Sequence, residues 1–311
     1  MRPTNPLPEI LRTSRKGCKG MNLFKCLMTQ STCYKDTTKG TPVGILWHDT
    51  GAGNPTIKRY VQPDDNAQDR AALLAKIGKN QYSNDWNHIS LQAGVNAFIG
   101  KLADGSIATA QVLPWNYRPW GCGSGPKGSC NGSPYANNGP HWIQFEICDD
   151  GYNSKSYFDK VYKEAVELTA YLCMKYGIDP HGTVQYKDPK KQIPVTVPTI
   201  LCHQDSYQLG VGGNHGDVLI WFKKYGKTMN DVRNDVAAEI AAQTAPAQED
   251  PAPTNPFEDV PDGKFYTKAV QWAHENGITA GTTPTTFAPD KPCTRGEMVV
   301  FLKRLYDLLK K

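Results

Sequence analysis

Residues 142–148 read Trp142-Ile-Gln-Phe-Glu-Ile-Cys148, a stretch in which apolar and polar side chains largely alternate. Successive side chains of a strand point to opposite faces, so the stretch predicts a buried strand with Ile143, Phe145 and Ile147 on one face. Glu146 lies on the other face, where a carboxylate is unfavourable unless it is paired or used. Two roles fit Glu146: a salt-bridge or helix-cap partner, or a general base with a raised pKa beside a metal-bound water.

Other apolar runs place this strand in a larger sheet. Short runs bounded by turn-rich segments predict further strands at residues 43–48, 94–100, 107–112 and 199–202. Apolar residues at spacings of three and four predict a long amphipathic helix over 158–172, and a second helix is expected over 67–78. The sequence therefore predicts an α/β fold in which a mixed central β-sheet is flanked by helices.

The composition excludes several classes of protein. The 311 residues suffice for about two domains. No apolar run approaches the roughly 20 residues of a membrane-spanning helix, so no membrane span is expected. The net charge of +5 arises in residues 1–47, which hold eight basic and two acidic side chains. Because this charge is modest and terminal, no nucleic acid partner is expected. Attraction to an anionic cell-wall polymer explains the charge as well as nucleic acid binding would.

The N-terminal segment and the cysteines bear on the compartment. Residues 1–20 contain no continuous apolar segment, so no secretory signal peptide is predicted. Met21 is a second plausible start, and residues 1–20 are interpreted as a flexible extension or a start-site artefact. Nine cysteines without a CxxC pair disfavour a zinc ribbon and a complete disulfide framework. We expect reduced thiols, with the pairs Cys26–Cys33 and Cys122–Cys130 as the alternative in an oxidising compartment.

The clearest domain boundary is an Ala- and Pro-rich stretch at residues 241–256, which is typical of a semi-extended linker. It separates a large region, residues 21–240, from a short module, residues 257–311. From periodicity alone the short module is a small helical unit with two amphipathic helices joined by a turn-rich loop.

Histidines end two of the predicted strands. His48 follows the run 43–47, and His203 follows the run 199–202. The segment after His203 is predicted to be a polar loop that continues to Asn214-His215-Gly216-Asp217. A catalytic zinc site needs three protein ligands and an open position. His48, His203 and either His215 or Asp217 meet that requirement, while the alternative is that these are surface histidines at strand ends.

An ordered set of motifs resembles a known enzyme family. The set comprises residues 47–51, 103–107, 113–115, 143–146, 202–203 and 214–217. Over about residues 40–240 it looks like the type 2 N-acetylmuramoyl-L-alanine amidases, which are related to peptidoglycan recognition proteins and phage endolysins. The resemblance implies a zinc amidase catalytic domain over residues 21–240.

The resemblance also implies residue roles. Zinc is expected on His48, His203 and Asp217, with His215 stabilising the oxyanion and Glu146 near the zinc-bound water; His215 as the third ligand is the alternative. Asn96 and Gly121 stand where relatives commonly carry a His or Tyr and a His, so Asn96 is expected on the substrate side. Trp115 and Trp120, near Tyr117 and Arg118, are candidates for a sugar or stem-peptide groove, although loop aromatics are as often packing residues.

The C-terminal module strongly resembles one S-layer homology repeat. It has the Phe257-Glu-Asp-Val260 opening, the Gly277-Ile-Thr-Ala-Gly281 turn and the Thr294-Arg-Gly-Glu297 motif. Such repeats bind secondary cell-wall polymers of Gram-positive bacteria, often as three copies. The resemblance implies that Arg295 contacts an anionic glycan, or else is a structural residue at a helix start, and that self-association supplies the missing repeats.

These observations predict a zinc-dependent peptidoglycan hydrolase. It would cleave the amide bond between N-acetylmuramic acid and L-alanine, and its C-terminal repeat would hold it on the wall. The alternative is a peptidoglycan-binding protein without turnover. Without a signal peptide, the expected location is the cytoplasm until lysis, as for a phage endolysin, or the outside of the cell at the wall, as for an autolysin.

Overall fold

The structure is a computed structural model that describes residues 21–245 and 255–310. The chain divides after Thr244 into two compact units. The predicted extension, residues 1–20, and residues 246–254 of the predicted linker lie outside the described residues. Residues 241–244 of that linker instead belong to helix α6 (Met229–Thr244), so the predicted boundary at residue 240 falls inside a helix. The reason is that Ala and Gln are favourable helix residues, and they extend α6 beyond its last buried side chain.

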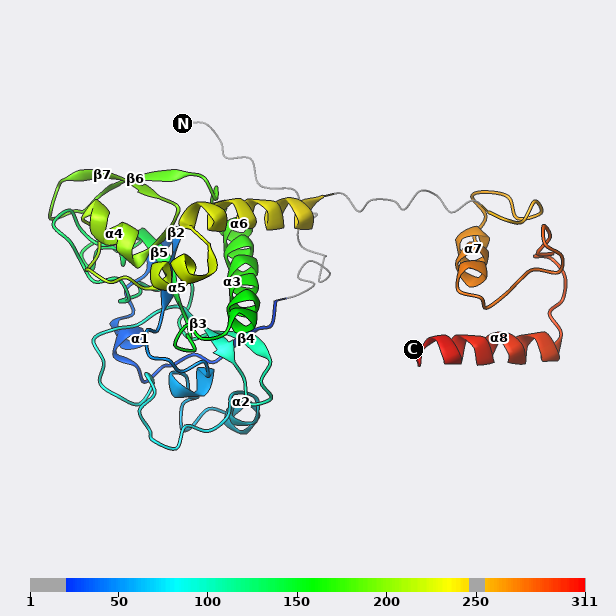
Figure 1. The fold of residues 1–311 in the computed structure, drawn as a ribbon, viewed down its shortest axis with the longest axis horizontal. Coiled ribbons are helices and arrows are strands. Elements are labelled where there is room, and N and C mark those ends of the chain that lie inside the picture. The colour runs from blue at the N-terminus through cyan, green and yellow to red at the C-terminus, as the bar shows by residue number, and fades with distance from the viewer. Residues whose placement is uncertain (1–20, 246–254, 311) are drawn as a thin grey trace. The chain divides into compact units, whose positions relative to one another are not determined.

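The first unit is built on a six-stranded sheet with the strand order β1-β4-β3-β5-β2-β8; Figure 1 labels its strands β2, β3, β4 and β5. The strands are β1 (Leu23–Lys25), β2 (Gly40–Asp49), β3 (Ala97–Lys101), β4 (Ile107–Gln111), β5 (Gly139–Ile147) and β8 (Ile200–Cys202). Neighbouring strands are parallel, except that β3 and β4 are antiparallel. The structure thus confirms the predicted mixed sheet, and the five predicted strands correspond to β2, β3, β4, β5 and β8.

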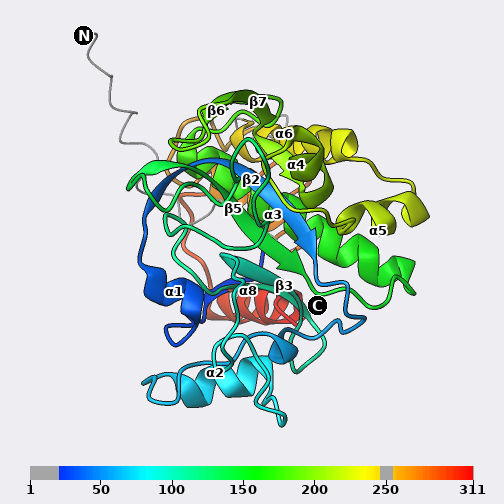
Figure 2. The same ribbon diagram turned by 90° about the vertical axis from the view of Figure 1, so that its left-hand side faces the viewer.

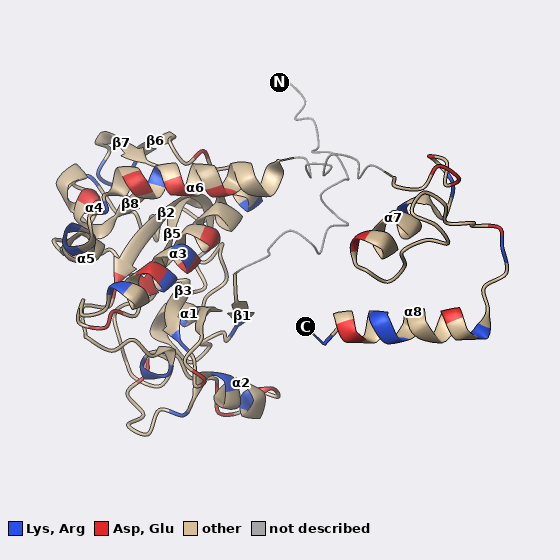
Figure 3. Cartoon of the chain, turned by 45° about the vertical axis from the view of Figure 1, so that its right-hand side comes forward, with Lys and Arg blue, Asp and Glu red and all other residues tan. Residues whose placement is uncertain are grey.

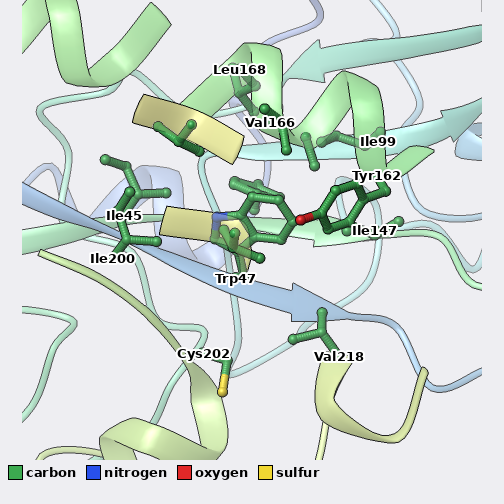
Figure 4. Close-up of a cluster of buried hydrophobic side chains, with 14 of the residues drawn as sticks. Ile45, Trp47, Ile99, Ile147, Tyr162, Val166, Leu168, Ile200, Cys202 and Val218 are labelled. Atoms are coloured by element: carbon green, nitrogen blue, oxygen red, sulfur yellow. The ribbon is translucent and has the colours of Figure 1, made fainter. Parts of the chain in front are cut away.

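One face of the sheet is covered by helices and forms the main core (Figure 4). The helices are α3 (Lys155–Tyr176), α5 (Val218–Tyr225) and α6. Trp47 of β2 is fully buried there, with its ring centroid 5.1 Å from Phe145 and 6.0 Å from Tyr162. The long helix α3 contains the predicted stripe, and its N-cap Ser154 accepts a hydrogen bond from the backbone N–H of Tyr157.

The other face of the sheet carries two smaller apolar clusters. One packs Phe98 against Tyr60 and Ile77, from the segment that contains α1 (Thr32–Asp36), η2 (Ile57–Arg59) and α2 (Arg70–Ile77). The other packs Leu46 and Trp142 against the separate two-stranded hairpin of β6 (Thr183–Lys187) and β7 (Pro194–Pro198). In Figure 2, β2 and β5 run side by side through the middle of the unit, with these segments around them.

The second unit contains helices α7 (Thr267–Glu275) and α8 (Arg295–Leu308), which correspond to the two predicted helices. Phe257, Val260 and Val270 form its small buried cluster. Helix α8 begins with a capping box between Thr294 and Glu297, has no buried residue and carries charges of both signs along its length (Figure 3). Within the described parts of both units, no helix is long and apolar enough to cross a bilayer.

Candidate active site

Parallel strand pairing brings three candidate residues, His48, Glu146 and His203, to the C-terminal ends of neighbouring strands. Residue His48 of β2 is directly opposite Glu146 of β5, and Trp47 is opposite Cys202 of β8. His203 follows Cys202 and therefore lies at the same strand ends as His48, where α/β sheets commonly place their sites. His203 is also the first residue of helix α4 (His203–Leu209), so the prediction of a polar loop directly after His203 is wrong. Asp205 caps this helix by accepting the backbone N–H of Cys202, which explains the polar sequence.

Asp217 completes a group of three metal-binding side chains. Its Oδ2 lies 3.0 Å from His48 Nδ1 and 2.7 Å from His203 Nδ1. One ligand atom from each residue lies within 4.8 Å of the others, and no second such group of three or more occurs in the described residues. Asp217 precedes helix α5 with a φ of 41°, an unusual conformation for a residue other than glycine.

Outer hydrogen bonds orient both histidines toward Asp217. His48 Nε2 lies 3.0 Å from Gln144 Oε1, and His203 Nε2 lies 3.1 Å from the carbonyl oxygen of Cys122. Because both of these oxygens only accept hydrogen bonds, each Nε2 carries the proton and each Nδ1 keeps its lone pair. Two such nitrogens and one carboxylate are ligands that zinc takes, and oriented outer partners are typical of its sites.

The orientation of the Gln144 amide is itself fixed by the backbone. The N–H of Cys122 donates to Asn131 Oδ1 at 3.1 Å, so this atom is an acceptor. Gln144 Nε2 donates to the same oxygen at 2.8 Å, and therefore Gln144 Oε1 faces His48. Gly121 leaves room for this contact, because a Cβ there would lie only 2.4 Å from Gln144 Oε1.

The carboxyl of Asp217 is held in its charged form. Burial opposes its ionisation, but the contacts of Asp217 with His203 and His48 outweigh burial and hold its pKa well below its usual range. The His203 and His215 rings are stacked with centroids 4.8 Å apart. His215 is exposed and lies outside the group of three, which contains Asp217 instead.

Glu146 has the opposite electrostatic environment. Its side chain is 9% exposed, and its Oε2 has no hydrogen-bond partner among the described residues. Burial, followed by the charges of Asp217 and Asp49, raises the pKa of Glu146 well above its usual value. A carboxyl whose pKa is raised in this way is suited to proton transfer.

The structure gives Asn96 and Trp115 structural positions instead of the predicted substrate contacts. Asn96 is fully buried; its Nδ2 donates to the carbonyl oxygen of Pro114 at 3.0 Å, and its Oδ1 accepts the N–H of Gln144 at 3.0 Å. Trp115 is 7% exposed and belongs to the main core cluster. Both side chains are therefore used within the fold, and Trp115 also lines a surface pocket with Lys25 and Tyr171.

The other two predicted contacts remain accessible. Trp120 is half-buried and lines a surface pocket, with its Nε1 donating to Asp36 at 3.2 Å. Arg295 is exposed in the first turn of α8, in the second unit.

Several residues of the site were missed in the sequence. Gln144, Asn131 and the carbonyl of Cys122 orient the histidines, and Asp149 holds the turn after His48 by accepting the backbone N–H groups of Ala52 and Gly53. Only Gln144 had a signal, because the period of two places it on the same face as Glu146. All eight described cysteines are free, and seven of them are buried.

Both units match known protein families. Residues 38–216 match the family described as N-acetylmuramoyl-L-alanine amidase, and residues 256–299 match the S-layer homology domain. Among solved structures, the chain resembles the hydrolase AmiA of Staphylococcus aureus in complex with its ligand, with 18% identity, coverage of 74% of this chain and 88% of that chain, and a TM-score of 0.42.

Two further solved structures show a similar level of likeness. A mutant endolysin from Bacillus subtilis shares 16% identity, with 70% of this chain and 99% of that chain covered and a TM-score of 0.39. The PlyG catalytic domain shares 16% identity, with 73% and 99% covered and a TM-score of 0.38. A comparison with curated proteins returned no match. Since the family match spans more than half of the 311 residues and includes both His48 and His203, the chain belongs to the N-acetylmuramoyl-L-alanine amidase family.

Proposed function

We propose that the protein is a zinc-dependent hydrolase that cleaves the amide bond between N-acetylmuramic acid and the L-alanine of the stem peptide. The observation that carries the proposal is the convergence of His48, His203 and Asp217, with both Nδ1 atoms directed at one carboxylate. In such a site zinc supplies Lewis-acid activation of the scissile carbonyl and of water. His48, His203 and Asp217 would hold it.

The remaining steps belong to side chains of the chain itself. Glu146 takes a proton from the attacking water and passes it to the leaving nitrogen of L-alanine, a role that its raised pKa supports. His215 is exposed beside His203 and donates a hydrogen bond to the oxyanion of the tetrahedral intermediate. We retain Asp217 as the third zinc ligand, because it contacts both histidines and His215 stacks outside them.

The test is digestion of purified peptidoglycan followed by mass analysis of the products. We expect free stem peptides that begin with L-alanine, loss of product with a chelator, and recovery on adding zinc. Glu146→Gln should lower the rate about 10²- to 10⁴-fold while zinc content stays the same. If stoichiometric zinc is bound and peptidoglycan is retained but no amide is cleaved, the protein is a non-catalytic peptidoglycan-binding protein and the proposal fails.

We further propose that the second unit binds a secondary cell-wall polymer, with Arg295 contacting an anionic group, and that the protein acts at the wall. Several large apolar side chains of α8 are exposed, among them Val299 at 65% and Leu302 at 60%, which supports self-association of the single repeat. Sedimentation velocity of the full chain over a range of concentrations tests self-association. A monomer at all concentrations would contradict it.

A further inference from the structure

A pocket of about 500 Å³ opens at the β1 edge of the central sheet. It is formed by β1, by the segment that follows β4 and by the C-terminal part of α3. Four aromatic side chains and two lysines line it: Phe24, Trp115, Tyr171, Tyr176, Lys25 and Lys175. The pocket therefore combines an aromatic surface with positive charge from segments that are distant in the sequence.

The pocket is separate from the metal-binding residues. Strands β4, β3 and β5 lie between β1 and β2, which carries His48, so four strand spacings separate β1 from β2 by about 19 Å. Trp115 belongs to the core cluster on the face covered by α3, and Tyr171 packs against that cluster. His48 points to the opposite face of the sheet. The proposed hydrolysis therefore does not account for this pocket.

The two lysines of the pocket have no anionic partner. Both are exposed, and no Asp or Glu is among the described residues that line the pocket. Throughout residues 21–245 and 255–310, no carboxylate forms an ion pair with Lys25 or Lys175. Lys175 lies in the last turn of α3, where a cation is favourable beside the helix C-terminus, but this explanation does not apply to Lys25 on β1. Two unpaired cations without a neighbouring anion favour an anionic ligand.

The aromatic side chains and an amide suit a sugar. The Nζ of Lys175 lies 5.9 Å from the ring centroid of Tyr171 and 5.8 Å from that of Tyr176, and both rings are partly exposed. An exposed ring beside a cation can pack against the C–H face of a sugar while the ammonium group pairs with an acidic substituent. The exposed Asn116 also lines the pocket, and its amide can form hydrogen bonds with sugar hydroxyls.

Aromatic rings and cations also occur together in sites for single-stranded nucleic acid. Such sites follow the backbone with a row of cations along several phosphates, whereas this pocket offers two lysines. We propose that this pocket binds an anionic glycan of the cell wall, with Lys25 and Lys175 pairing with its carboxylate or phosphate groups and its sugar rings packing on Tyr171 and Tyr176.

This inference goes beyond the functions proposed above, because it gives the first unit a wall contact that needs no turnover. Ion pairs at exposed positions are weak. The pocket therefore assists the second unit, and it does not by itself retain the chain on the wall.

The test is an NMR titration of the full chain, labelled with ¹³C at tyrosine, with tetragalacturonate, in which each sugar ring carries a carboxylate. Tyr176→Phe assigns the Tyr176 signal, which should shift on titration. We expect Lys25→Ala/Lys175→Ala to raise the Kd about three- to tenfold and Lys25→Arg/Lys175→Arg to restore it. The matched control is Lys223→Ala/Lys224→Ala on α5, which removes two exposed lysines elsewhere and should leave the Kd unchanged.

Three further probes decide what the pocket recognises. The methyl ester of tetragalacturonate keeps the rings without the charges, inorganic polyphosphate has charges without rings, and a thymidine oligonucleotide represents nucleic acid. Each should bind the pocket more weakly than tetragalacturonate, and equal or tighter lysine-dependent binding of any of them overturns the assignment. No shift of the Tyr176 signal, or an unchanged Kd in the alanine variant, also overturns it.

A loss of binding in Arg295→Ala with no change in Lys25→Ala/Lys175→Ala would place the glycan site in the second unit and would equally overturn the assignment. None of the probes contains the scissile amide. The outcome is therefore independent of the amidase proposal, and a protein that cleaves no amide but binds tetragalacturonate through these lysines still supports the pocket.

Discussion

The amide of Gln144 determines which nitrogen of His48 is available to a metal. Gln144 Oε1 accepts a hydrogen bond from the Nε2–H of His48, so Nδ1 faces Asp217 with a free lone pair. His203 is arranged in the same way by a backbone carbonyl. The two ligands therefore differ in robustness, because a side-chain substitution can remove the partner of His48 but not the partner of His203.

Replacing Gln144 by alanine should lower zinc affinity about 10- to 100-fold, because His48 loses the hydrogen bond that sets its tautomer and ring orientation. Competition with a chromophoric chelator measures this affinity directly. Gln185→Ala on β6 is a suitable control, since the Gln185 amide contacts Thr196 at the surface. Unchanged zinc affinity in Gln144→Ala would contradict the orienting role of the amide.

Asp49 should make the stability of the zinc-free protein depend on pH. Burial, followed by the charges of Asp217 and Asp149, raises the pKa of Asp49 from an ordinary 3.8 to about 7. Between these values the folded state binds more protons than the unfolded state, so the free energy of unfolding falls as pH rises through this window. Above pH 7, Asp49→Asn should be more stable than the natural chain by on the order of 1–3 kcal/mol, and the two should be equal near pH 4.

Urea unfolding of the chelator-treated proteins at pH 4, 5.5 and 7.5 measures this difference. Asp159→Asn, at an exposed position of α3, serves as the control variant. If the difference in free energy of unfolding between Asp49→Asn and the natural chain does not grow with pH, Asp49 is not the source of the pH dependence.

At the scale of elements, strand β2 serves the core and the site at once. Trp47 points into the main core, where it contacts Phe145 and Phe222, whereas the next residue, His48, points to the opposite face and reaches Asp217. The position of His48 is therefore set by the packing of its neighbour. Damage to the core on this strand should reach the metal-binding residues.

Trp47→Ala should lower the free energy of unfolding of the first unit by about 3–5 kcal/mol, because it leaves a cavity between β2 and α3. Urea denaturation followed by tryptophan fluorescence and circular dichroism measures the loss. Trp272→Ala, at a position that is 47% exposed in the second unit, should leave the unfolding transition of the first unit unchanged. A loss below about 1 kcal/mol in Trp47→Ala would mean that the sheet does not depend on this residue.

Much of the fold follows from local patterns, and the exceptions have physical causes. The alternation in 142–148 and the apolar run 43–48 predict β5 and β2, because both strands are long and buried. Strand β1 has only three residues, and β6 has a single buried residue, so neither has a strong apolar period. Strand β7 alternates, but it is short and has proline at both ends, which is typical of a turn-rich segment. Helix α4 was missed because its polar residues cap and cover it.

The site could be predicted as far as residue types at strand ends allow. His48 and His203 come together because β2 and β8 are adjacent and parallel, and Asp217 joins them through the start of α5. Asn96 and Trp115 could not be placed, since whether a loop or strand residue faces solvent depends on the tertiary structure around it. The contact between Gln144 and Asn131 likewise depends on a loop that folds back over β5.

At the scale of the whole molecule, the chain joins an amidase unit to an S-layer homology unit. Each unit has its own buried cluster, and α6 ends the first unit before the junction. Binding of the second unit to the wall raises the concentration of the first unit near its substrate, an effect that can reach 10²- to 10⁴-fold in apparent affinity. Substrate recognition and retention on the wall can therefore be separated.

Deletion of residues 257–311 should abolish cosedimentation with purified cell walls and leave the hydrolysis of a soluble muramyl peptide unchanged, because the residues proposed for catalysis all lie in the first unit. Arg295→Ala is the matched point variant and should weaken cosedimentation without altering the soluble rate. Equal wall retention by the truncated chain would contradict the role of the second unit.

The N–H of Cys122 has a wider consequence, because it gives a direction to the hydrogen bonds that lead through Asn131 and Gln144 to His48. Because the donor is a main-chain N–H, substitution of the Cys122 side chain cannot reverse this direction. Replacement of Cys122 by another small residue should therefore leave the proton of His48 on Nε2. Proline is the exception, because it has no backbone N–H and would remove the donor that orients Asn131 and Gln144.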